Sequence, residues 1–143
     1  RMTVMIQREV AQRLAAAPGT KDYGAFTVFA NWHCEVKKLF DVPPECFMPR
    51  PKVTSSVVAL TPRAQPPCEV RDEKLMFRCV RAAFAQRRKT LSNALANGLG
   101  AYTREQVNAA LEAAGVSTQA RGETLGAREF AAISDRLSQI EAI

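Results

Sequence analysis

Apolar residues follow two different patterns along the chain, one before residue 62 and the other after residue 67. In the first part, short runs rich in β-branched residues predict strands at residues 3–6, 36–42 and 55–61. Residues 3–6 are apolar without interruption, so we expect this strand to be buried on both faces, as in a parallel sheet. The other two strands are expected to pair with each other.

Residues 7–17 carry apolar side chains at helical spacing, and Pro18 ends this pattern. Residues 26–34 have the same spacing, but their residue types also suit a strand. Gln7 and Glu9 follow the end of the first strand, where sites form in α/β folds. A plain role at the start of a helix explains both residues equally well.

The segment 62–67 holds three prolines without apolar periodicity, which is typical of a linker. The chain beyond it is predicted to be helical. Asp72 can cap a helix that runs to about residue 86, with an apolar face formed by Leu75, Met76, Cys79, Val80 and Ala83. Further helices are expected at residues 92–96, closed by Asn97 and Gly98, at 104–115 behind a Thr103–Gln106 capping box, and at 127–141 with Phe130, Ile133, Leu137 and Ile140 inward.

This order of elements predicts the tail of an α/β sheet in residues 1–66 and a small all-α domain in residues 67–143. The strands are too few for a complete doubly wound sheet. No strand is followed by a glycine-rich turn that could hold a nucleotide-like cofactor. The sequence therefore indicates the back portion of a larger protein.

The chain of 143 residues has a net charge of +6, which favours a polyanionic partner such as nucleic acid. No apolar run approaches the ~20 residues of a membrane span, and no leader pattern is visible. The four cysteines form no Cys-x-x-Cys pair, so neither zinc ligation nor redox chemistry is expected. We expect reduced, mostly buried thiols in a cytoplasmic protein.

Phe47 opens a segment in which Pro49 and Pro51 fix two φ angles and push their predecessors toward extended geometry. The result is a stiff strut with an aromatic ring at its start and the cations Arg50 and Lys52 along it. Such a strut suits the holding of an unstacked base beside its phosphate. The alternative is a loop whose phenylalanine only fills the core.

A second candidate feature is cationic. Four basic residues fall at helical spacing on one predicted stripe, and three more follow: Arg71, Lys74, Arg78 and Arg81, then Arg87, Arg88 and Lys89. Because phosphate contacts dominate RNA affinity, these side chains are candidate RNA contacts. The alternative is an ordinary solvated helix face.

Five segments carry motifs in a fixed order, at residues 5–14, 18–24, 47–55, 83–95 and 128–130. Residues 47–55 fit the pattern Phe-x-Pro-x-Pro-Lys-Val-x-Ser. Together the segments resemble the small-subunit (16S) ribosomal RNA adenine N6-dimethyltransferase family, from about residue 2 to the end of the chain. Arg50 departs from the family pattern, because a proline is common there. The resemblance favours a helix at residues 26–34.

The resemblance implies that residues 1–66 are the C-terminal strands and helices of a Rossmann-like methyltransferase sheet, without the N-terminal half of that sheet. It implies a helical RNA-binding domain in residues 67–143. Family members carry their S-adenosylmethionine site and their Asn-(Leu/Ile)-Pro-Tyr motif ahead of the matched region. We therefore expect no cofactor-binding residue on this chain. By the same resemblance, Phe47 stacks on the flipped target adenine.

The implied parent enzyme dimethylates two adjacent adenines in small-subunit ribosomal RNA, with the 30S particle as its partner, and this chain alone is expected to be inactive. The implied RNA contacts are Arg50, Lys52, Arg71, Lys74, Arg78, Arg81, Arg87, Arg88 and Lys89. One alternative is a large-subunit methyltransferase of the antibiotic-resistance type. Others are a non-catalytic RNA-docking or ribosome-assembly module, and a helix-turn-helix DNA binder formed from residues 72–115.

Overall fold

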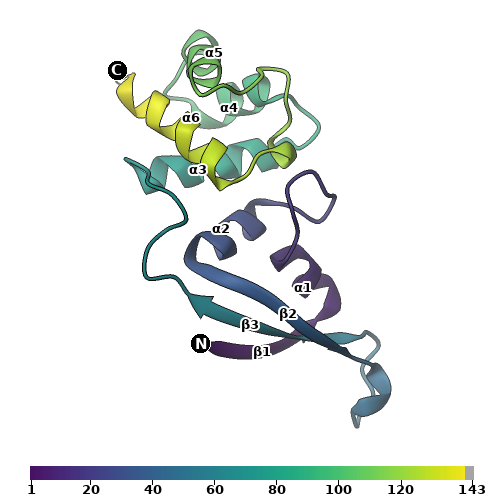
Figure 1. The fold of residues 1–143 in the computed structure, drawn as a ribbon. Coiled ribbons are helices and arrows are strands. Elements are labelled where there is room, and N and C mark those ends of the chain that lie inside the picture. Colours follow the sequence, from purple (N-terminus) through teal and green to yellow (C-terminus); the bar gives the residue numbers. More distant parts are fainter. Residues whose placement is uncertain (141–143) are drawn as a thin grey trace. The chain divides into compact units, whose positions relative to one another are not determined.

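The computed structural model describes residues 1–140, which form two compact units (Figure 1). The first unit comprises Arg1–Ala17 and Asp22–Pro66, and the second comprises Pro18–Lys21 and the chain from Pro67 onward. The division after Pro66 falls in the proline-rich segment. Pro18–Lys21, which the sequence pattern assigns to the first region, belongs instead to the helical unit.

The first unit contains a three-stranded sheet of β1 (Met2–Gln7), β2 (Cys34–Val42) and β3 (Ser55–Pro62). The strand order is β1-β3-β2, and β3 pairs antiparallel with both neighbours. The predicted pairing of the second and third strands is confirmed. The long ribbon formed by β2 and β3 runs along the whole sheet (Figure 1).

The expectation that the first strand is buried in a parallel sheet is wrong. β1 pairs antiparallel with β3, and the side chains of Met2 and Met5 are 53% and 54% exposed. A continuous apolar run indicates burial only when other layers cover both faces of the strand. Among residues 1–140, β1 has one neighbouring strand, and its apolar side chains are exposed at Met2 and Met5 and half-buried at Val4 and Ile6. The buried strand is β3, whose Val58 and Ala59 lie in the core.

Two helices, α1 (Arg8–Leu14) and α2 (Ala25–His33), pack beside this sheet. The helix favoured by the resemblance at residues 26–34 is confirmed by α2. Its buried face carries Thr27, Val28 and Trp32. The Thr27 hydroxyl donates to the carbonyl of Arg13 over 2.7 Å, which fastens α2 to the end of α1.

The second unit holds α3 (Glu73–Ala85), α4 (Leu91–Leu99), α5 (Arg104–Ala113) and α6 (Ala127–Gln139). Two short 3₁₀ helices complete the described elements, η1 (Pro44–Cys46) in the first unit and η2 (Gly122–Thr124) in the second. All four long helices contribute to one core. Its fully buried side chains are Met76, Val80, Leu91, Leu95, Val107, Leu111, Phe130, Ile133 and Leu137.

The predicted helix starts at Asp72 and Thr103 are confirmed. The Asp72 carboxylate accepts from the Leu75 amide over 3.1 Å, and Thr103 with Gln106 forms the expected capping box. The predicted apolar face of the first of these helices is buried as expected.

Helix α1 ends at Leu14, three residues before the end that the pattern over residues 7–17 predicts, and two ends in the second unit also differ from prediction. The fourth helix continues through Asn97 and Gly98 to Leu99, and Gly100, with φ of 54°, ends it. The last helix ends at Gln139, and Ile140 caps it half-buried rather than packing inside. The predicted end at residue 141 lies outside the described residues. Asn-Gly pairs favour a helix stop, but here a tertiary contact keeps Gly98 inside the helix.

That contact is the close approach of α3 and α4. A Cβ added at Gly98 would lie 2.5 Å from the Cβ of Ala82 and 3.2 Å from its Cα. Ala82 is buried and has no longer side chain that could swing away. Gly98 is therefore required by packing between helices rather than by backbone conformation.

We expect Gly98→Ala to destabilise the protein by about 1–2 kcal/mol. Overpacking costs roughly 1–3 kcal/mol, and the gain in helix propensity returns up to about 1 kcal/mol. Urea unfolding measures the change. Ala82→Gly in the same molecule should recover part of the loss, and Gly24→Ala, where nothing lies within 4 Å, serves as control. Additive effects at Gly98 and Ala82 would contradict the proposed contact.

Candidate nucleic-acid interface

The strut lies in the loop that closes the β2–β3 hairpin. The ladder ends at the pair Val42 and Ser55, so residues 43–54 connect the two strands. Phe47 follows the short helix η1, and its amide donates to the carbonyl of Pro44 over 3.2 Å. The Met48–Pro49 peptide bond is cis. The hairpin thus presents Phe47 from a loop anchored on both sides by strands.

Phe47 is half-buried and is not one of the buried core side chains. Its backbone is extended, with φ of −118° and ψ of 152°. The next side chain, Met48, is 98% exposed. Phe47 is therefore partly accessible to another molecule.

The two cations of the strut are exposed. The Arg50 guanidinium forms a 2.6 Å ion pair with Glu45, which belongs to η1 at the start of the same loop. Both side chains of this pair are more than half exposed, so the pair contributes at most about 1 kcal/mol. Lys52 lies near the other end of the loop.

A shallow hollow of about 250 Å³ lies where β1 runs into α1. Gln7, Arg8, Glu9 and Gln12 line it, together with Val53 and Thr54 from the end of the loop. The Arg8 amide donates to the carbonyl of Thr54 over 2.9 Å, so the loop that carries Phe47 is fastened to the first turn of α1. The location at the C-terminal end of a strand is typical of sites in α/β folds.

The base of the loop is held by a cross-strand pair of side chains. The buried Ser56 hydroxyl donates to Asp41 over 2.6 Å, and Lys38 lies 3.0 Å from the same carboxylate oxygen. The hydrogen bond from Ser56, with a smaller effect of Lys38, lowers the pKa of Asp41 below its ordinary 3.8. The ionised form of Asp41 therefore stabilises the folded hairpin.

Ser56→Ala should raise the pKa of Asp41 toward 3.8, measured by NMR titration of its carboxyl group. The folded pKa is below the unfolded one, so this stabilisation is present above the unfolded pKa and is lost as pH falls through the folded pKa. The stability difference between the two proteins should thus be largest near neutral pH and shrink below about pH 4. Ser55→Ala, one position along β3, is the control. An unchanged Asp41 pKa in Ser56→Ala would refute the assignment.

The cationic stripe is only partly continuous. Lys74, Arg78 and Arg81 are exposed on α3, as the spacing indicates. Arg71 is not on this helix, because Asp72 is its N-cap residue. Placing Arg71 on the same helical stripe was therefore wrong. The Arg71 amide instead donates to Asp135 of α6 over 2.9 Å.

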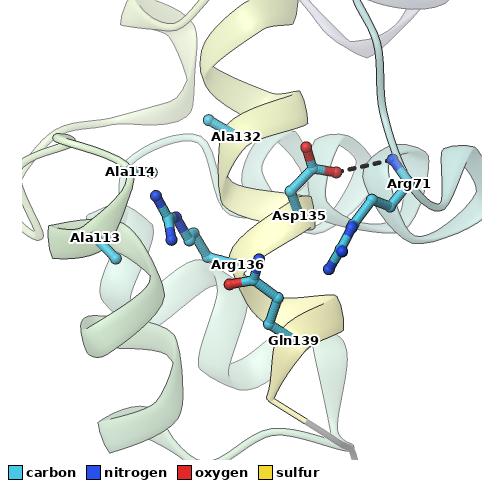
Figure 2. Close-up of a pocket in the computed structure, with 7 residues that line it drawn as sticks. All are labelled: Arg71, Ala113, Ala114, Ala132, Asp135, Arg136 and Gln139. Atoms are coloured by element: carbon cyan, nitrogen blue, oxygen red, sulfur yellow. Dashed lines mark hydrogen bonds between the residues drawn. The ribbon is translucent and has the colours of Figure 1, made fainter.

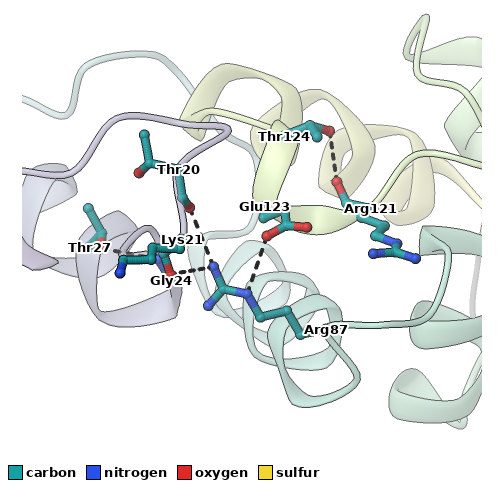
Figure 3. A network of polar contacts seen from close by, with 8 residues as sticks. All are labelled: Thr20, Lys21, Gly24, Thr27, Arg87, Arg121, Glu123 and Thr124. Carbon is teal, nitrogen blue, oxygen red and sulfur yellow. Dashed lines mark hydrogen bonds and ion pairs between the residues drawn. The ribbon is translucent and has the colours of Figure 1, made fainter.

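Arg87 makes internal contacts in the helical unit (Figure 3). Its guanidinium lies 3.3 Å from the Glu123 carboxylate and donates to the Lys21 carbonyl over 2.8 Å. The same group lies 5.9 Å from the centre of the Phe84 ring, a cation–π contact. Arg87 therefore fastens Pro18–Lys21 and η2 to the end of α3.

The next two side chains, Arg88 and Lys89, are exposed on the turn after α3. The three consecutive basic residues therefore differ in their surroundings. Arg87 has partners within the protein, whereas Arg88 and Lys89 face solvent. Charge spacing alone could not separate them, because the polar partners of Arg87, Glu123 and Lys21, lie more than 30 positions away.

Two strands of the described residues run directly into helices. Among residues 1–140, β1 runs directly into α1 through Gln7, and β2 runs into η1 through Pro43. Neither turn contains a glycine whose backbone could approach a ligand closely. These two turns therefore lack the glycine-rich pattern that is typical of nucleotide-binding turns.

The described part of the chain contains no group of three or more His, Cys, Asp or Glu residues placed to hold a metal ion. None of its helices is long and apolar enough to cross a membrane. Four cysteines are free, but only Cys79 is buried, so the expectation of mostly buried thiols was wrong. Burial raises the pKa of Cys79 to about 12, so this thiol stays protonated.

The chain shares its fold with part of two solved methyltransferases. A dimethyladenosine transferase from Plasmodium falciparum matches with a TM-score of 0.78 and 22% identity, over 92% of this chain and 54% of that one. The 23S rRNA methyltransferase ErmE matches with a TM-score of 0.63 and 28% identity, over 96% of this chain and 54% of that one. The chain therefore has the fold of about half of each of these two methyltransferases.

Residues 1–139 match the sequence profile of the family described as ribosomal RNA adenine dimethylase, and the chain belongs to this family. It is 51% identical over 138 residues to ribosomal RNA small subunit methyltransferase A of Geobacillus thermodenitrificans. It is 52% identical over 134 residues to a protein of the same name from Desulfitobacterium hafniense. The alignments cover 95% and 94% of this chain but 47% and 48% of the relatives, so the chain spans about half their length.

Proposed function

We propose that this chain is the C-terminal portion of a cytoplasmic enzyme that dimethylates two adjacent adenines of small-subunit ribosomal RNA during ribosome assembly. The family match over residues 1–139 carries this proposal. It is supported by relatives, about half identical to this chain, that are named small-subunit methyltransferases. The methyl donor of the parent enzyme would be S-adenosylmethionine.

The proposal divides the work between the two units. Residues 1–66, with β1, β3 and β2 as the last strands of a larger Rossmann-like sheet, would present the target base. Residues 67–143 would hold the RNA backbone through exposed cations. The residues that bind the cofactor would belong to a preceding half-sheet, which is consistent with the lack of glycine in the β1–α1 and β2–η1 turns. The chain alone would then be inactive.

Phe47 would be the residue that contacts the reacting base. The lone pair of the adenine N6 amine is delocalised into the ring, so methylation at this nitrogen requires a base held in a fixed orientation. A half-buried ring on a loop fastened at both ends supplies one face for stacking. Base–aromatic stacking contributes about 1–3 kcal/mol per base. The adjacent Arg50 and Lys52 would hold the neighbouring phosphates.

In the full-length enzyme, Phe47→Ala should lower kcat/KM for small-subunit rRNA by about tenfold or more, the equivalent of losing one stacked base. RNA affinity, measured by fluorescence anisotropy, should change much less, because cations supply most of it. Phe47→Trp should retain most activity, and Met48→Ala, at the neighbouring exposed position, is the matched control. Full turnover in Phe47→Ala would instead support the non-catalytic docking module.

The exposed cations and Arg87 should respond differently to loss of charge. Arg88→Gln in the full-length enzyme should weaken RNA binding and reduce the slope of log K against log salt by about 1, with little effect on thermal unfolding. Arg87→Gln should lower the unfolding midpoint, because it leaves Glu123 without its partner. Lys37→Gln, an exposed charge on β2, controls for net charge. Equal effects of Arg88→Gln and Lys37→Gln on RNA binding would contradict the assignment.

The similarity of the fold to that of ErmE supports one alternative function, the methylation of large-subunit rRNA. The curated relatives at about 50% identity carry the small-subunit name and favour the first proposal. A map of N6-methylated adenines in both ribosomal subunits, with and without the full-length enzyme, decides between the two.

A further inference from the structure

The helical unit contains an open hollow of about 400 Å³, well away in sequence from the strut and from Arg88 (Figure 2). Four polar side chains line it: Arg71, Asp135, Arg136 and Gln139. The rest of the lining consists of three alanines, from the end of α5 and from α6. The volume lies in the range of small-molecule sites.

Neither arginine of the hollow forms an ion pair with a carboxylate of the described residues. Among the ion pairs of residues 1–140, none includes Arg71 or Arg136. The one carboxylate in the lining, Asp135, accepts the backbone amide of Arg71 over 2.9 Å. That hydrogen bond holds Arg71 at the rim and occupies one oxygen of Asp135. Two guanidinium groups therefore remain for an anion.

The lining also has an apolar part and an amide. In Figure 2, the Gln139 side chain lies between the guanidinium groups of Arg71 and Arg136, and Ala113 and Ala132 mark the alanine-lined side. Methyl groups offer a flat apolar surface without donors or acceptors. An anion with an attached planar or sugar group would use both parts of the hollow, whereas a bare anion would use only the arginines.

We propose that this hollow binds one nucleotide of the RNA, with its phosphate on Arg71 and Arg136 and its base or sugar over the alanines. The identity of the occupant as RNA rests on the proposed function, and the site extends it. Helix α3 has 13 residues at a rise of about 1.5 Å each, so Arg71 and Arg88 lie near opposite ends of a segment roughly 20 Å long. The helical unit would then hold RNA at two separate points.

A simpler role for the two arginines must be distinguished from this one. The hollow lies at the C-terminal ends of α5 and α6, where the helix dipole favours cations. Arg136 in the last turn of α6 would stabilise that end without any ligand. In that case, removing Arg136 would lower stability and leave nucleotide binding unchanged.

The test uses the ¹⁵N-labelled full-length enzyme and uridine 5′-monophosphate, because the proposed target base and methyl donor both carry adenine. Millimolar nucleotide should shift the backbone amide signals of Ala113, Ala114 and Gln139. Arg71→Gln and Arg136→Gln should each weaken this binding at least fivefold. Arg128→Gln, an exposed arginine on the first turn of α6 outside the hollow, is the matched control and should not.

Three results would overturn the site. The first is that millimolar uridine 5′-monophosphate does not shift these amide signals. The second is that inorganic phosphate binds as tightly as the nucleotide. The third is that Arg136→Gln lowers the stability of the protein and leaves nucleotide binding unchanged. In rRNA titrations, Arg71→Gln with Arg136→Gln should reduce the salt slope by about 2. The amide shifts test the site, and a methylation assay tests the proposed function. An enzyme that binds the nucleotide in this hollow but does not methylate rRNA would disprove the proposed function without contradicting the site.

Discussion

The antiparallel pairing of β3 with β2 is the constraint on which the candidate site depends. Because the ladder ends at Val42 and Ser55, it fixes both ends of the loop that carries Phe47. The Asp41–Ser56 hydrogen bond lies one residue pair inside that end and holds the register where the loop begins. A one-residue slip would turn every side chain of β3 to the opposite face, so the register is strongly specified. A stiff loop can orient a ring only when its two ends are fixed in this way.

Local signals in the sequence were sufficient where local interactions decide the structure. The cap at Asp72, the capping box at Thr103 and the apolar face of α3 all depend on residues within about four positions of each other. The end of α4 depends on Ala82, 16 positions before Gly98 in the chain, and no local pattern reveals it. The apolar β1 could not be placed on an open edge for the same reason, since its burial is decided by what lies beside it.

The candidate site shows the same division. Phe47 could be selected from the sequence because two prolines beside an aromatic residue are a local signal, and the family motif contains them. The internal role of Arg87 could not, since Lys21 and Glu123 come from opposite ends of the chain. Of the residues that line the hollow at Arg136, only Arg71 was a candidate from the sequence. Its lining comes from three separate segments, and alanines carry no chemical signal of their own.

Burial and the number of partners separate the basic side chains by what an incoming phosphate would have to displace. Arg50 has an exposed partner in Glu45, and a pair of this kind contributes at most about 1 kcal/mol, so a phosphate can replace that carboxylate at little cost. Arg87 would lose a carboxylate, a carbonyl and a ring contact together. Net charge counts these two arginines equally. Under the proposed function, RNA affinity should therefore depend on the exposed, weakly paired cations, and the loss of Arg87 should weaken RNA binding only by destabilising the helical unit.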